Sequence, residues 1–390
     1  MPSLGGRHQG NTALRRSTDR ILTTHVGSLP DPEGLGRHRD GDVVRGRVED
    51  IVRQQRAIGL DIINEGEWTK GGDWLSYVED RFSGFEQRPP KDLPVLLQGK
   101  DRAEFADFYR YATERGTLYY TPGEAKKRSG RPHWACTGPI VYRGTAALKR
   151  EIEAFAAVVD PAEAFLTSTS PASLEPYREN EFYQSEEEFV YAIAEAMRTE
   201  YEAIAQAGFI LQVDDAWLPA LWDRIGMAMG LDPFRRRCMV RVEALNHALR
   251  NVPEERIRYH LCWGSWHGPH AYDIEMIHMV DIMLRVKAQA YLFEAANVRH
   301  EHEYAIWQTV KLPASKIIVP GVVTHSTDIV EHPDLVAQRL IRFANLVGKE
   351  NVMAGTDCGF GGRSHPQIAW AKLASLTEGA KLASKALGYR

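Results

Sequence analysis

Eight short apolar runs recur along the chain, and longer stretches with helical spacing separate them. The runs are RILTTHVGS, LDIINEGE, EAFLTSTSP, FILQVDDAW, RIRYHLCWG, QAYLFEAAN, KIIVPGVVTHS and NVMAGTDCG. Residues 185–208 and 334–350 place apolar side chains at helical intervals between such runs. Strands that alternate with helices favour a parallel sheet covered by helices. Eight such units predict an α/β fold, a (β/α)8 TIM barrel. The rival, a doubly wound sheet, would need a glycine-rich turn after its first strand, and the chain lacks one.

One region does not follow this alternation. Residues 82–145 contain the β-rich segments GTLYY and WACTGPIVY, with turn residues between them. We interpret them as a β-hairpin insertion between barrel strands 2 and 3, which covers the barrel mouth or forms a subunit contact. The sequence therefore leaves open whether the chain forms a homo-oligomer. Residues 1–19 are polar and arginine-rich and predict a flexible N-terminal tail. Residues 20–390 then form a single catalytic barrel.

Charge and cysteine content exclude several classes of partner. The chain has 48 lysines and arginines interspersed with 52 aspartates and glutamates, and its net charge is −4. This pattern predicts no nucleic-acid partner and no membrane-surface partner. No run of about 18 apolar residues occurs, so no transmembrane helix is expected. Four scattered cysteines are too few for a disulfide framework and favour a reduced, cytoplasmic setting.

Ionisable side chains gather where the predicted strands end. In a parallel barrel, functional residues lie at the carboxyl ends of the strands, so these side chains are expected to share one rim. In strand order, they are His25 with Ser28, Glu67, Asp214 with Asp215, His260 with Cys262, Glu294, His325 and Cys358.

Four of these residues predict a zinc site. His260 and Cys262 are two positions apart, so both point to the same face of an extended chain. Together with Glu294 and Cys358 they offer the nitrogen, sulfur and oxygen donors that zinc binds as a tetrahedron. Each residue alone has a structural explanation, since a lone cysteine is most often a small buried apolar side chain. Their joint placement at strand ends carries the prediction. The segment RHEHEY at 299–304 is assigned to a polar loop or helix start instead.

The same residues carry a family resemblance. The segments TTHVGSLP, GLDIINEGE, LQVDD, HLC, LFEAANVR, GVVTHS and GTDCGFGGR resemble the C-terminal catalytic barrel of the cobalamin-independent methionine synthase superfamily, over roughly residues 20–375. HLCWGSWHGPH, YVEDRFSGF and CTGPI are similar to its single-barrel branch, which includes epoxyalkane:coenzyme M transferase. The sequence departs from the synthases in two ways: it reads DDA in place of DEP, and it has no second barrel.

The resemblance implies roles for individual residues. It places zinc on His260, Cys262, Glu294 and Cys358. It implies that Ser28, Glu67 and Asp214 hold the amino-acid part of a homocysteine-like thiol. It also implies that His325 moves a proton at the leaving group.

The prediction is zinc-dependent transfer of a methyl or other alkyl group to a thiol that is activated as a zinc thiolate. The partners are a small-molecule thiol and an alkyl donor, either a methyl carrier or an epoxide. Ring opening of the epoxyalkane:coenzyme M transferase type, a metal-free lyase similar to uroporphyrinogen decarboxylase, and a non-catalytic metal-binding barrel remain alternatives. Arg299 and Arg363 lie near the predicted site and either bind a carboxylate or sulfonate or form surface or structural salt bridges. The expected catalytic residues are His325 and Asp214, and the expected substrate-binding residues are His25, Ser28, Glu67, Asp214, Asp215 and Arg299.

Overall fold

A parallel sheet of six strands forms the centre of the protein. The computed structural model describes residues 14–31, 41–70, 74–118 and 133–389. The strands lie in the order β3-β5-β6-β7-β8-β9, and every neighbouring pair is parallel. They are β3 (Phe165–Thr169), β5 (Ile210–Asp215), β6 (Ile257–Leu261), β7 (Ala290–Phe293), β8 (Ile317–Val323) and β9 (Gly355–Thr356).

Two extended segments near the N-terminus close this sheet into a ring. Thr23 forms a parallel bridge with Ala354, which precedes β9, and Ile63 forms one with Ala164, which precedes β3. The two segments also meet each other, because the amide of Ile62 donates to the carbonyl of Thr23 at 3.1 Å. Eight strand segments therefore follow one another around the ring. The α/β class and the parallel barrel predicted from the eight apolar runs are confirmed.

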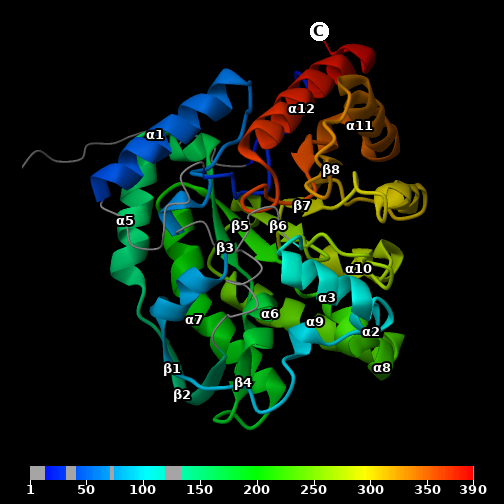
Figure 1. Cartoon of the computed structure of the whole chain (residues 1–390). Coiled ribbons are helices and arrows are strands. Elements are labelled where there is room, and N and C mark those ends of the chain that lie inside the picture. The colour runs from blue at the N-terminus through cyan, green and yellow to red at the C-terminus, as the bar shows by residue number, and fades with distance from the viewer. Residues whose placement is uncertain (1–13, 32–40, 71–73, 119–132, 390) are drawn as a thin grey trace, which may run out of the picture.

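Helices lie around these strands (Figure 1). The long helix α7 starts after Ser185, whose hydroxyl accepts the amide of Glu188 at 3.1 Å, and its first turn is acidic. Both features stabilise a helix N-terminus, as expected for residues 185–208. The helices are α1 (Gly41–Ala57), α2 (Lys100–Glu104), α3 (Ala106–Arg115), α5 (Thr145–Ala156), α6 (Pro171–Leu174), α7 (Glu186–Gln206), α8 (Met227–Met229), α9 (Leu231–Ala248), α10 (Val280–Met283), α11 (Pro333–Val347) and α12 (Pro366–Ala386).

The two faces of the curled sheet pack into separate apolar clusters. Phe165 and Leu292 belong to a small cluster, whereas their neighbours Leu166 and Tyr291 belong to the large cluster that includes the helices. Successive residues of a strand point to opposite faces, which accounts for this division. The small cluster lies on the inner face of the ring, together with the buried Arg258, whose guanidinium carbon is 4.0 Å from the centre of the Phe165 ring.

A second sheet lies outside the ring. It contains β1 (Phe82–Gln87), β2 (Trp134–Tyr142) and β4 (Arg178–Asn180), in the order β1-β2-β4. Strand β2 pairs antiparallel with β1 and parallel with β4. The predicted hairpin joined β2 to residues 116–120 instead. Within that segment, Thr117 and Leu118 lie in a turn, and residues 119–132 are outside the described part of the chain. The hairpin therefore stays a prediction.

The described part of the predicted tail packs against the barrel. Leu14 and Ser17 are buried, and the Ser17 hydroxyl donates to the carbonyl of Val352 at 2.6 Å. Residues 14–19 are thus ordered against the ring, where we expected a flexible segment, and residues 1–13 lie outside the described range. Within the described residues, no helix has the length and apolar character needed to span a bilayer.

Candidate active site

The register of β5 and β6 brings an aspartate beside a histidine. Asp214 lies opposite His260, and their Oδ1 and Nδ1 atoms are 3.0 Å apart. A hydrogen bond to this carboxylate requires the proton on Nδ1, which leaves the lone pair of Nε2 available. Nε2 is buried and has no partner among the described residues. Burial alone would lower the pKa of His260, but the hydrogen bond and charge of Asp214 raise it above its usual value.

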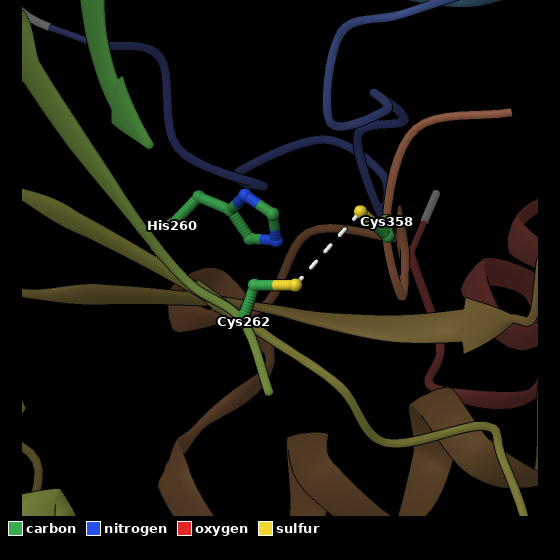
Figure 2. A group of neighbouring side chains, drawn as sticks. All are labelled: His260, Cys262 and Cys358. Atoms are coloured by element: carbon green, nitrogen blue, oxygen red, sulfur yellow. Dashed lines mark hydrogen bonds between the residues drawn. The ribbon is translucent and has the colours of Figure 1, made fainter. Parts of the chain in front are cut away.

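Two cysteines approach this imidazole from different strands. Cys262 follows β6 and Cys358 follows β9, and their sulfur atoms are 4.0 Å apart. Figure 2 shows the imidazole and both thiols pointing toward one another. The ligand atoms of the three residues all lie within 4.8 Å of one another, and all three side chains are buried. The contact with Cys262, together with the positive charge of Arg363, holds the pKa of Cys358 well below its usual value.

This group fits a zinc ion. Zinc–sulfur bonds of about 2.3 Å at tetrahedral angles separate two thiolates by about 3.8 Å, close to the distance between these sulfurs. An imidazole nitrogen without a hydrogen bond, fixed by a carboxylate on its other nitrogen, is the usual arrangement of a metal-bound histidine. Thiolate and imidazole donors also favour zinc over magnesium or calcium. His260, Cys262 and Cys358 are therefore suited to hold zinc.

Glu294, the fourth predicted ligand, lies near this group but is engaged elsewhere. Its Oε1 accepts the amide of Trp263 at 3.0 Å, and its Oε2 accepts the side-chain amide of Asn297 at 2.6 Å. Burial, with the negative charges of Asp357 and Cys358, raises the pKa of Glu294 to about 7. In this conformation the carboxylate does not join the group of three ligands, so its role as a ligand stays a prediction.

A second carboxylate faces Asp214 across the site. Glu67 is held in a turn with φ of 61°, a left-handed conformation that is uncommon for residues other than glycine. Burial raises the pKa of Glu67 to about 8, and the negative charge of Asp214 adds to this effect. Its Oε2 is buried without a partner in the described structure. A positively charged group between the two carboxylates would relieve their repulsion.

The glycine-rich segment after β9 wraps around Ser28. The amides of Phe360 and Gly361 donate to the Ser28 carbonyl at 2.8 and 3.2 Å. A Cβ atom on Gly359 would overlap the Ser28 hydroxyl, so only glycine allows this approach. The segment thus brings Ser28 next to Cys358.

A cavity of about 380 Å³ connects these residues. One side, here called the strand-end side, consists of residues that follow the barrel strands. The opposite side, here called the insertion side, comes from residues 96–118 and from the loops that contact them. The strand-end side includes Ser28, Glu67, Asp214, His260, Cys262 and Cys358. The insertion side includes Leu96, Leu97, Arg102, Thr113, Leu118, Trp217, Arg224 and Trp266.

Five of the predicted site residues do not line the cavity, and Glu294, described above, is one of them. Asp215 accepts hydrogen bonds from Ser173, Leu218 and Tyr259, because it points to the opposite face of β5 from Asp214. The other three also lie outside the cavity wall. Nε2 of His25 forms a hydrogen bond with Gln55 at 2.8 Å. Arg299 is exposed, and its guanidinium donates to the Ala271 carbonyl. His325 is buried, and burial lowers its pKa to about 3.

Comparisons with known proteins agree with this geometry. No protein-family model matches the chain. Methionine synthases of Saccharolobus solfataricus and Sulfolobus acidocaldarius are each 22% identical to it, over 94% and 92% of this chain and 96% and 91% of those proteins. The chain is thus similar in sequence to methionine synthases over nearly its whole length. A B12-independent methionine synthase from Shewanella sp. in complex with selenomethionine has the same fold, with a TM-score of 0.70, 16% identity and coverage of 94% of this chain and 99% of that one. A putative vitamin-B12 independent methionine synthase from Listeria monocytogenes has a TM-score of 0.63 and 18% identity, and the match covers 93% of this chain and 98% of that one.

The cavity also contains residues that the sequence pattern did not single out. Trp217 directly follows the two aspartates after β5, and Trp266 lies within HLCWGSWHGPH, so both stood next to recognised motifs. Arg102 and Arg224 had no such signal, because Arg102 lies in the insertion and Arg224 lies in the helical turn Trp222–Gly226 beyond the end of β5. The folding of residues 96–118 over the strand ends brings Arg102 to the cavity, beside Arg224 from the segment after β5.

Proposed function

We propose that this protein transfers a methyl or other alkyl group from a donor to the sulfur of an amino thiol, with zinc as its cofactor. Homocysteine is the first thiol to test, because the relatives over nearly the whole chain are named methionine synthases. The observation that carries the proposal is the zinc-type group of His260, Cys262 and Cys358, which opens into a cavity beside two carboxylates.

His260, Cys262 and Cys358 would hold the zinc. When bound there, zinc supplies the charge that deprotonates a coordinating thiol at neutral pH. In the overall reaction the thiol loses its proton, a sulfur–carbon bond forms, and the bond between that carbon and the donor breaks. The donor atom leaves with the bonding electrons.

The chain's own residues position the thiol substrate. Glu67 and Asp214 flank a space in which a substrate ammonium group would neutralise their repulsion, and Ser28 offers a hydroxyl beside Cys358. Asp214 also fixes the orientation of His260 through the 3.0 Å contact at Nδ1. Holding both reactants in one buried cavity replaces a bimolecular encounter with a pre-oriented one, which is worth several kcal/mol in favourable cases.

The carboxylate pair favours an amino thiol over the alternatives. The pKa of Glu67, raised to about 8 by burial and by the charge of Asp214, indicates that this space disfavours additional negative charge. A sulfonate thiol such as coenzyme M, or an acidic tetrapyrrole, would bring such a charge. His325 stays a predicted proton donor. The pKa lowered by burial makes its ring neutral at physiological pH, so the proton it would give must first come from elsewhere.

Metal analysis of the purified, reduced protein tests the proposal. We expect about one zinc per chain in the wild type and its loss in Cys262→Ser and Cys358→Ser. Cys238→Ser is the matched control, because this buried cysteine contacts the Leu218 carbonyl and not the ligand group. Retention of zinc in both ligand variants would refute the proposed metal site.

Substrate positioning is tested separately with Glu67→Gln. The variant is expected to raise the KM or Kd for homocysteine about tenfold or more while zinc content stays unchanged. An unchanged homocysteine affinity would refute the assignment of the ammonium group to this carboxylate.

A further inference from the structure

Both cysteines of the ligand group line the cavity that would admit the alkyl donor. Cys262 is 2% exposed and Cys358 is 6% exposed, and both form part of the cavity wall. In the proposed reaction the substrate adds a third thiolate to the same space. Every thiolate is a nucleophile, so the alkyl group could be transferred to a cysteine instead of the substrate. Such a transfer would destroy a zinc ligand.

The loop that follows β6 provides a hydrogen-bond partner for each of the two sulfurs. The amide of Gly264 donates to the sulfur of Cys262 at 3.3 Å. The hydroxyl of Ser265 lies 3.3 Å from the sulfur of Cys358. Gly264 has φ of 93°, a conformation that favours glycine. Two consecutive residues of one loop therefore contact both ligand sulfurs.

Arg363 decides which way the Ser265 hydroxyl points. Its Nε donates to Ser265 Oγ at 2.7 Å, and its Nη1 donates to the carbonyls of Gly359 and Gly361 at 3.4 and 3.2 Å. Since Oγ accepts this N–H, its own proton is left for another acceptor. In the described structure, the sulfur of Cys358 is the other partner of this hydroxyl. A thiol that coordinates zinc has lost its proton, so there the hydroxyl is the donor and the sulfur is the acceptor.

A hydrogen bond of this kind lowers the reactivity of the sulfur. Hydrogen bonds to a charged acceptor are stronger than those to a neutral one. Alkylation converts the thiolate into a neutral thioether, so the bond weakens as the new sulfur–carbon bond forms. The bond therefore stabilises the unreacted Cys358 more than the transition state of its alkylation, which slows that reaction.

We propose that Ser265, oriented by Arg363, protects Cys358 from alkylation and thereby directs the alkyl group to the substrate sulfur. The Gly264 amide protects Cys262 in the same way. Ser265 is thus a specificity-determining residue that acts through a metal ligand. This inference rests on the proposed function, because it explains how one of three sulfurs in the same site is selected.

Methyl iodide, applied to the zinc-loaded protein without homocysteine, tests the proposal. A sulfur–carbon bond forms, iodide leaves with the bonding electrons, and peptide mass spectrometry gives the methylation rate of each cysteine. In Ser265→Ala, Cys358 is expected to react about three- to tenfold faster than in the wild type, while the rate at Cys262 changes less than twofold. An unchanged ratio of the two rates would overturn the proposal, and so would an equal rise at both cysteines, which indicates a loosened loop.

Three further variants complete the experiment. Ser265→Thr keeps the hydroxyl and should restore the slow rate at Cys358. Arg363→Lys keeps the positive charge but removes the Nε donor, so it should raise the rate at Cys358 alone, and it keeps the proposal testable if Ser265→Ala does not fold. Ser364→Ala is the matched control, because the buried Ser364 hydroxyl has no partner among the described residues. A rise at Cys358 in Ser364→Ala equal to that in Ser265→Ala would refute the assignment.

Cobalt(II) in place of zinc gives a readout that is independent of alkylation. A hydrogen bond lowers the energy of the sulfur lone pairs, so its loss in Ser265→Ala should move the sulfur-to-cobalt charge-transfer absorption to longer wavelength. An unmoved band would contradict the proposed hydrogen bond. Failure of the proposed function appears separately, as a wild type that binds no zinc or does not alkylate homocysteine. Failure of this inference appears as an unchanged rate ratio in a Ser265→Ala variant that carries zinc.

Discussion

Replacement of Asp214 by Asn should weaken zinc binding without removing a zinc ligand. Asp214 Oδ1 accepts His260 Nδ1 at 3.0 Å and Gln212 Nε2 at 2.7 Å. An asparagine has the same size, but it has no charge to hold the imidazole in the tautomer whose Nε2 faces the cysteines. Loss of a carboxylate behind a metal-bound histidine typically costs 10- to 100-fold in metal affinity. The expected cost is therefore about 1.4–2.7 kcal/mol.

The affinity is measured by competition with a chelator of known zinc affinity, at fixed pH and under reducing conditions. Asp215→Asn provides a control at the neighbouring position. Asp215 is equally buried, but it bonds Ser173, Leu218 and Tyr259 and lies on the other face of β5. The Asp215→Asn variant should have a lower unfolding temperature than the wild type, while its zinc affinity stays within about twofold of the wild-type value.

Two results would refute this reasoning. The first is an unchanged zinc affinity in Asp214→Asn, which would mean that the carboxylate does not orient His260. The second is an equal loss of affinity in Asp215→Asn, which would attribute the effect to general destabilisation of β5.

Two further predictions concern stability. Burial alone would raise the pKa of Glu200, but the Arg81 guanidinium and the hydrogen bonds that Glu200 accepts lower this pKa to about 2. The ionised Glu200 carboxylate therefore contributes about 3 kcal/mol to the free energy of unfolding above pH 5. This contribution is lost between about pH 5 and 2. Urea unfolding across this range should show the loss in the wild type, and a Glu200→Gln variant with the same pH dependence would contradict the assignment. Gly264→Ala should cost about 1–3 kcal/mol, because Gly264 has φ of 93° and a Cβ there would overlap the Trp266 ring. Gly116→Ala, at φ of 68° with open space around it, should cost no more than about 1 kcal/mol in thermal unfolding, and an equal loss in both variants would exclude a role for the overlap.

Much of the site follows from local sequence pattern. His260 and Cys262 are two residues apart on a strand, so the alternation of side chains sets them on one face before any fold is known. Eight apolar runs separated by amphipathic segments predict a parallel sheet covered by helices, and the lack of a glycine-rich turn after the first strand favours the barrel over a doubly wound sheet. The meeting of Cys358 with Cys262 then follows from the barrel, which gathers strand ends at one rim.

Tertiary structure decided which members of each motif serve the site. Asp214 and Asp215 look equivalent in sequence, but the register with β6 pairs only Asp214 with His260, and the pleat turns Asp215 away. Glu294 ends a strand as predicted, yet Trp263 and Asn297 hold its carboxylate outside the ligand group. These outcomes depend on contacts between residues far apart in the chain, which no local pattern contains.

The sequence by itself predicted the barrel, because periodicities of two and 3.6 residues act within single elements, and it singled out His260, Cys262 and Cys358 as candidate ligands because each ends a predicted strand. Only the tertiary structure decided the shape and chemistry of the opposite cavity wall. Arg102 and Arg224 come from segments more than one hundred residues apart, and neither carries a motif. The folding of residues 96–118 over the strand ends brings Arg102 beside Arg224, because the apolar contacts of Leu118 and Tyr109 with Trp266 hold that segment there.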